Sequence, residues 1–102
     1  TFAEATAAGE PIPYRGYLAH PVSGRRMNLY TNQPCVQLYT ANFLTDDGCL
    51  LKGGMVKRPN IAVCLETQRM PDGMNHAGFI SPYLDVGERY DYTTVYQFSV
   101  TQ

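Results

Sequence analysis

The sequence predicts an all-β protein, and three observations lead to this expectation. Apolar and polar residues alternate with a period of two in several segments, and no segment carries the stripe of an amphipathic helix. Clusters of Gly, Pro, Asn and Asp separate these segments, as turn residues do between strands. The 102 residues are 44% hydrophobic, which is the composition of a folded chain. We expect about five or six strands joined by long loops.

The chain opens with a segment, residues 1–13, that is rich in Ala, Thr and Glu and ends in Pro-Ile-Pro. This composition is typical of a linker or a cut loop, so we expect the β-structure in residues 14–102. Residues 25–31 then predict a strand with Met27 and Leu29 on one face. Its other face carries Arg26, Asn28 and Tyr30. Asn32-Gln33-Pro34 predicts the turn that ends it.

Residues 35–43 predict the next strand, and residues 61–68 predict a β-branched, almost continuously apolar one. One face of the first is expected to carry Cys35, Gln37, Tyr39, Ala41 and Phe43. Asp46-Asp47-Gly48 and Gly53-Gly54 bracket the intervening loop, and Pro71-Asp72-Gly73 predicts a turn.

The last predicted strand covers residues 89–101, which alternate over their whole length. One face is expected to carry Tyr90, Tyr92, Tyr96, Phe98 and Val100. The other is expected to carry Arg89, Asp91, Thr93, Gln97 and Ser99.

Glu66 fits its strand less well than any other residue. Residues 61–65 have the pattern of a strand buried on both faces, where Glu is rare unless it is paired or functional. At the end of such a strand we expect a carboxylate that is held rigidly and partly withdrawn from water, which suits a general base. The alternative is that Glu66 pairs with an Arg and closes the end of the strand.

Gln37 is the second polar residue in an apolar setting, between Val36 and Leu38. An amide there needs hydrogen-bond partners, which could be backbone groups or the hydroxyls of a ligand.

Charge and cysteine content exclude several classes of function. The net charge of −1 excludes a polybasic nucleic-acid arm, and the longest apolar run, residues 61–65, is far shorter than the ~20 residues of a membrane helix. We therefore expect neither nucleic acid nor a membrane as partner. Cys35, Cys49 and Cys64 lack the spacing of zinc or redox motifs. They indicate free buried thiols and a reducing, cytoplasmic location.

Several motifs in register resemble the aldose 1-epimerase (galactose mutarotase) family. They run in the family's order between residues 14 and 100: Ser23-Gly24-Arg25-Arg26, residues 36–44, residues 64–68 with Pro71-Asp72 and Asn75, and residues 87–94 with 98–100. The resemblance implies the C-terminal part of a large antiparallel β-sandwich. It also implies interconversion of the α and β anomers of free aldohexoses such as galactose and glucose, without cofactor or metal.

The same resemblance implies roles for two residues. Glu66 matches the base that takes the proton of the anomeric hydroxyl, and Gln37 matches a position that hydrogen-bonds a sugar hydroxyl. The family's acid is a histidine further upstream, and neither His20 nor His76 lies in a matching context. We therefore expect a portion that is inactive alone and joins a complementary N-terminal polypeptide or self-associates, because a sandwich reduced to its last strands exposes apolar surface.

Four alternatives stay open. A sugar-binding module without catalysis would use Gln37, Glu66 and a stacking aromatic such as Tyr39 or Phe79. A phosphosugar epimerase would need a cationic cluster, for which Lys57-Arg58 and Arg25-Arg26 are the adjacent pairs. A glycosidase would need a second carboxylate facing Glu66, and Asp72 is the nearest in sequence. A purely structural β-domain would leave the clustered motifs unexplained.

Overall fold

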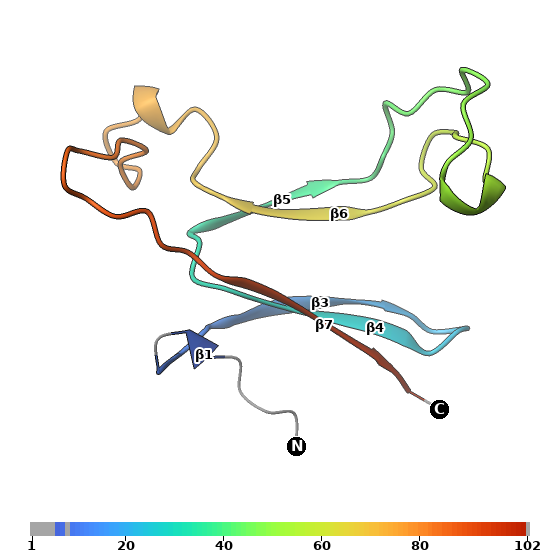
Figure 1. Cartoon of the computed structure of the whole chain (residues 1–102), viewed down its shortest axis with the longest axis horizontal. Coiled ribbons are helices and arrows are strands. Elements are labelled where there is room, and N and C mark those ends of the chain that lie inside the picture. The colour runs from blue at the N-terminus through green and yellow to red at the C-terminus, as the bar shows by residue number, and fades with distance from the viewer. Residues whose placement is uncertain (1–5, 8, 102) are drawn as a thin grey trace. The chain divides into compact units, whose positions relative to one another are not determined.

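A computed structural model describes residues 6–7 and 9–101, and Figure 1 shows the chain. The strands are β1 (Thr6–Ala7), β2 (Glu10–Pro11), β3 (Tyr14–His20), β4 (Arg25–Thr31), β5 (Cys35–Tyr39), β6 (Cys64–Gln68) and β7 (Thr94–Val100). The described part also has two short 3-10 turns, η1 (Lys52–Gly54) and η2 (Gly73–Asn75). All pairs of strands are antiparallel, so the predicted all-β class is confirmed.

The chain divides into two compact units, which we describe separately. The sheet unit comprises residues 1–34 and 69–102, and the hairpin unit comprises residues 35–68. Of the segment expected to be a linker, residues 1–5 and 8 lie outside the described residues. Within the rest of it, β1 pairs with β2, and Ile12 is only 5% exposed. The described end of the segment thus contributes to the core of the sheet unit.

The sheet unit is built on β4, which lies between β3 and β7 (Figure 1). Its bounds are those expected from the alternation of residues 25–31. Met27 stands opposite Leu18 and Phe98, and Leu29 stands opposite Gly16 and Tyr96, so the predicted apolar face is present. Leu29 is 3% exposed, whereas Phe98 at the outer strand is 75% exposed. The core therefore lies under β4, and the apolar side of β7 faces solvent.

The opposite face of this sheet carries a network of polar side chains. Arg26 Nε donates to Asn28 Oδ1 at 2.8 Å, and Asn28 Nδ2 donates to Gln97 Oε1 at 3.0 Å. The guanidinium of Arg26 also lies 3.7 Å from the ring centroid of Tyr17. Asn28 is 5% exposed, and these partners satisfy a polar group that would otherwise be costly to bury.

The final strand is shorter than predicted, because β7 begins at Thr94 rather than at residue 89. Beside the long backbone bond from the Asn32 N–H to the Thr93 carbonyl, at 3.4 Å, side chains provide the contacts at this point. Asn32 Oδ1 accepts from the Thr93 N–H at 2.8 Å, and Thr31 Oγ1 donates to the Thr93 carbonyl at 3.2 Å. Local side-chain bonds of this kind compete with strand pairing. Tyr90 and Tyr92 therefore precede the strand, and their rings lie 4.8 Å apart.

The hairpin unit pairs β5 with β6 and closes them with a loop that contains η1 and one isolated bridge, Leu50↔Val56. Both strands are shorter than predicted. Ala41 has a φ of 57°, in the left-handed region, so the backbone turns away soon after Tyr39. At the other end, residues 61–63 are not part of β6, and Val63 is 49% exposed. The expectation of a strand buried on both faces is therefore wrong for this unit, since two strands offer too little chain to cover both.

Candidate functional site

Gln37 and Glu66 are direct cross-strand partners in the hairpin unit. The register of β5 and β6 sets Gln37 opposite Glu66, with Tyr39 opposite Cys64 and Cys35 opposite Gln68. Partners on one face have Cβ atoms about 4.5–5.5 Å apart, so the carboxylate and the amide emerge side by side. The face expected to carry Cys35, Gln37 and Tyr39 is confirmed up to the end of β5.

Both side chains are exposed, in contrast to the partly desolvated setting expected for Glu66. Gln37 Nε2 donates to the carbonyl of Leu38 at 3.2 Å, so a backbone group provides the partner that its position demands. This bond uses one N–H of the amide, and the second N–H and Oε1 have the capacity to bind a hydroxyl group of a ligand. The pair therefore has the chemistry of a proton acceptor beside a hydrogen-bonding group, in water.

An aromatic pair adjoins these two residues. The rings of Tyr39 and Phe43 stack with their centroids 6.5 Å apart and an interplanar angle of 15°. Sequence reasoning placed Phe43 in the strand, whereas the structure folds it back onto Tyr39 by the turn at Ala41. Left-handed positions are usually taken by Gly or Asn, so an alanine there gives no signal that could have revealed this contact.

The loop of the hairpin unit holds an ion pair that bears on the phosphosugar alternative. Lys57 Nζ donates to Asp47 Oδ2, and the Cys49 N–H donates to Asp47 Oδ1 at 3.1 Å. The hydrogen bond from the Lys57 ammonium lowers the pKa of Asp47 to about 2, and the partner carboxylate raises the pKa of Lys57. The charge of Lys57 is thus matched within the loop, which disfavours it as a phosphate ligand.

The loop after β6 turns at Pro71 and Asp72 as predicted, and it belongs to the sheet unit. Both carboxylate oxygens of Asp72 are engaged, one by Asn75 Nδ2 and the other by His76 Nε2 at 3.1 Å. The ring of His76 also lies 4.9 Å from that of Phe79. These contacts make Asp72 the acceptor of a local turn, which disfavours the glycosidase alternative.

His20 is the last residue of β3, directly before the turn to β4. Its Nδ1 is 2.9 Å from Ser23 Oγ and accepts from the Ser23 N–H at 3.3 Å. Both residues are exposed, so His20 holds a surface turn together.

The three cysteines are free. The expectation that they are buried is wrong, because none of them is fully buried. Cys49 is exposed and Cys35 and Cys64 are half-buried, on the same face as Gln37 and Glu66. Among the described residues, no group of three or more His, Cys, Asp or Glu side chains could hold a metal ion. No helix in that same part of the chain is long and apolar enough to cross a membrane.

The fold and the site together define an all-β protein that presents a carboxylate, an amide and aromatic rings on one strand pair. This combination suits a polar ligand with an apolar side. Comparison with known proteins is consistent with that class. The family model of aldose 1-epimerase matches residues 14–97. The chain is 49% identical over 82 residues to a galactose mutarotase of Homo sapiens, covering 79% of this chain and 23% of the relative.

More distant relatives match slightly less of the chain. An aldose 1-epimerase of Escherichia coli is 33% identical over 75 residues, covering 72% of this chain and 21% of that protein. An aldose 1-epimerase of Streptococcus thermophilus is 31% identical over 78 residues, covering 74% and 22%. The chain belongs to the aldose 1-epimerase family. It spans less than a quarter of the length of these relatives.

Proposed function

We propose that this chain is the C-terminal portion of an aldose 1-epimerase and supplies its base, Glu66, together with one sugar contact, Gln37. The observation that carries the proposal is the cross-strand pairing of these two residues on one face of β5 and β6. Family membership supports the reaction class. The proposed substrates are free aldohexoses such as galactose and glucose.

The proposed reaction needs one proton acceptor and one proton donor. The Glu66 carboxylate takes the proton of the anomeric hydroxyl, and an acid protonates the ring oxygen as the C1–O5 bond breaks. The open aldehyde rotates about C1–C2 and closes with the two roles reversed. Each well-placed acid or base contributes about 10²–10⁴ in rate. Gln37 holds a hydroxyl of the sugar while the ring is open.

The acid in this proposal is a histidine outside this chain, on a complementary N-terminal polypeptide of the same enzyme. The chain spans 23% of its human relative, which leaves room for such a part. His76 is bound to Asp72 and His20 to Ser23, which argues against either as the acid. In this view residues 14–102 form a segment of a larger sandwich rather than an independent domain.

We also propose a cytoplasmic location, supported by three cysteines that are free in the structure. Reduced thiols of this kind are typical of a reducing compartment. Labelling of the native protein in cell fractions with a thiol reagent tests this location.

Polarimetry of freshly dissolved α-D-galactose tests the proposed activity. The chain is assayed alone and together with the remainder of the human relative, outside the 82 matched residues. We expect the mixture to accelerate mutarotation and Glu66→Gln to slow it by about 10²–10⁴. Glu10→Gln removes the same charge from an exposed residue of β2. It is the matched control and should retain full activity.

Two results would overturn the proposal. If the mixture is active and Glu66→Gln does not slow it, Glu66 is not the base. A mixture that forms a stable complex but leaves the rate of mutarotation unchanged rules out the proposed enzymatic activity. It favours a sugar-binding module without catalysis.

A further inference from the structure

Phe43 is an exposed aromatic side chain that the structure nevertheless holds in one place. It is 82% exposed, and its ring stacks on that of Tyr39 with an interplanar angle of 15°. At this exposure the ring buries little apolar area in the hairpin unit, so the unit gains little from Phe43 beyond its contact with Tyr39.

The turn at Ala41 fixes the position of Phe43. Ala41 is 2% exposed, and its carbonyl accepts from the N–H groups of Leu44 at 3.2 Å and Asn60 at 3.1 Å. The left-handed φ of 57° at a non-glycine residue costs free energy, and these two hydrogen bonds and the burial hold it there. The aromatic pair is therefore preorganised rather than loosely attached.

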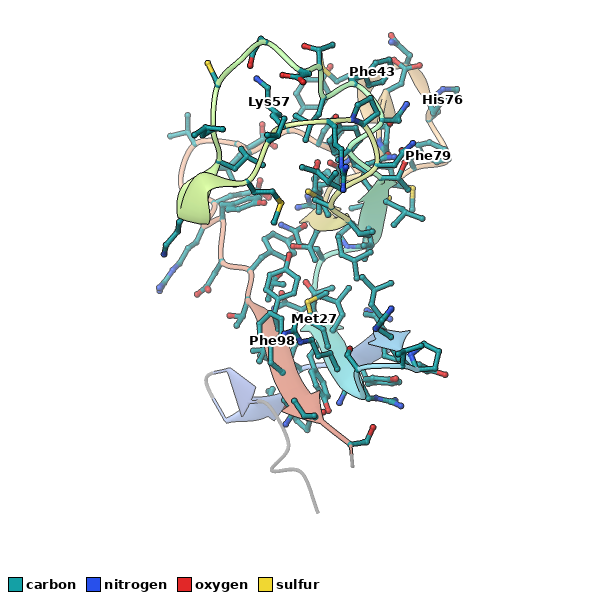
Figure 2. All side chains as sticks on the ribbon, turned by 90° about the vertical axis from the view of Figure 1, so that its right-hand side faces the viewer. Met27, Phe43, Lys57, His76, Phe79 and Phe98 are labelled. Atoms are coloured by element: carbon teal, nitrogen blue, oxygen red, sulfur yellow. The ribbon has the colours of Figure 1, made fainter. Side chains whose placement is uncertain are left out.

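The pair also lies next to the polar groups of the candidate site. Tyr39 is two residues from Gln37 on the same face of β5, and its cross-strand partner Cys64 is two residues from Glu66. An apolar ring surface thus adjoins a carboxylate and an amide. Figure 2 shows Phe43 on the hairpin unit, and Phe98 beside Met27 on the sheet unit. Phe98 is similarly exposed, at 75%, but its cross-strand neighbour Met27 is apolar.

We propose that Tyr39 and Phe43 form an aromatic platform that binds the apolar C–H face of an aldopyranose, while Glu66 and Gln37 bind its hydroxyl groups. The inference rests on the proposed function, since it concerns the same site. The π face of an aromatic ring is negative and attracts the weakly positive C–H groups that one side of a pyranose presents. Ligand sites commonly combine aromatic lining with a few placed polar groups in this way.

Protection of Cys64 from alkylation by iodoacetamide tests the platform without any need for turnover. Cys64 stands opposite Tyr39, so a sugar on the platform shields its thiol, whereas the exposed Cys49 lies in the loop and serves as the internal reference. We expect D-galactose to slow modification of Cys64 relative to Cys49, as measured by mass spectrometry of the full chain.

In Phe43→Ala, half-maximal protection should require about tenfold more galactose, the effect expected when part of the burial of one phenyl ring is lost. Phe43→Tyr should restore the original value. Phe98→Ala, the loss of an equally exposed ring on the sheet unit, should leave it unchanged. Because Phe43 is mostly in water, its removal should leave the fold intact, which circular dichroism checks.

Two outcomes would overturn the platform: no protection of Cys64 in the unmodified chain, or equal protection in the chain and in Phe43→Ala. Both can be separated from failure of the proposed function. If Glu66→Gln does not slow mutarotation in polarimetry, Glu66 is not the base. That result does not affect the protection of Cys64. Unchanged protection in Phe43→Ala removes the platform even when Glu66 is required for turnover.

Discussion

Gln37 has more hydrogen-bonding capacity than the one bond that it makes to its own strand, so it can also bind a ligand. We predict that Gln37→Ala, in the chain combined with its complementary part, raises the KM for galactose about three- to tenfold and changes kcat little. A neutral hydrogen bond contributes about 0.5–1.5 kcal/mol, and one made equally to substrate and transition state affects KM alone. Gln68→Ala, on the same face beyond Glu66, is the matched control. A fall in kcat with KM unchanged would contradict the assignment.

The ion pair between Asp47 and Lys57 makes the stability of the hairpin unit depend on pH in the acid range. The ammonium of Lys57 holds the pKa of Asp47 near 2, below its ordinary value of 3.8. A carboxyl whose pKa is lowered on folding stabilises the fold above its unfolded pKa, so the contribution is complete above about pH 4 and is lost as the pH falls through 2.

We therefore predict that Lys57→Met moves the NMR titration midpoint of the Asp47 carboxyl from about 2 back toward 3.8, because the donated hydrogen bond and positive charge are removed. Lys52→Met, which changes a lysine of η1 in the same loop, is the control and should leave the midpoint where it is. An unchanged midpoint in Lys57→Met would show that the ion pair does not persist in solution.

At the scale of elements, periodicity located the strands, but their ends depended on interactions that no pattern encodes. The alternation of residues 25–31 predicted β4 with its bounds, since both edges of this central strand pair with neighbouring strands. β5 ends at Tyr39, two residues before an alanine in a left-handed conformation, and β7 begins late because Asn32 bonds to residue 93. These are tertiary effects.

The arrangement of the candidate site was likewise predictable from the sequence only in part. The face shared by Gln37 and Tyr39 followed from alternation along one strand. The pairing of Gln37 with Glu66 could not, because register across the long intervening loop depends on how that loop folds. Phe43 was placed on the correct face for the wrong reason, as part of a strand that ends before it.

The turn between β3 and β4 has a strict requirement for glycine. Gly24 has a φ of 66°, and a Cβ there would lie 2.0 Å from the Thr101 carbonyl oxygen, which is far inside contact distance. Its own carbonyl accepts from the Thr101 N–H at 2.9 Å, so the two backbones cannot separate without losing a bond.

We accordingly predict that Gly24→Ala lowers the free energy of unfolding by about 1–3 kcal/mol, from backbone strain and the displaced Thr101. Gly78→Ala is the matched control, because a Cβ added at Gly78 would meet nothing within 4 Å and its φ is not in the left-handed region. Urea denaturation followed by circular dichroism compares the two. Equal losses in the two variants would show that the close approach of Gly24 to Thr101 does not determine the stability of the turn.

At the scale of the whole molecule, the outer strand β7 leaves an apolar surface in water. Phe98 is 75% exposed and Val100 is 66% exposed, on the face of β7 that continues the core of the sheet unit. An outer strand with exposed apolar side chains favours association with another chain. Since the chain spans less than a quarter of its relatives, we expect this face to be covered by a complementary polypeptide or, in its absence, by a second copy.

We predict that the isolated chain sediments as a species larger than a monomer, and that the double change Phe98→Ser and Val100→Ser shifts it toward the monomer. Burial of apolar area drives the association, so removing two exposed apolar side chains weakens it. Val86→Ser is the control, since Val86 is fully exposed in a loop and should contribute nothing. Adding the remainder of the human relative should convert the oligomer into a one-to-one complex. A chain that is monomeric at all concentrations, with or without that addition, would show that the apolar face of β7 tolerates water and recruits no partner.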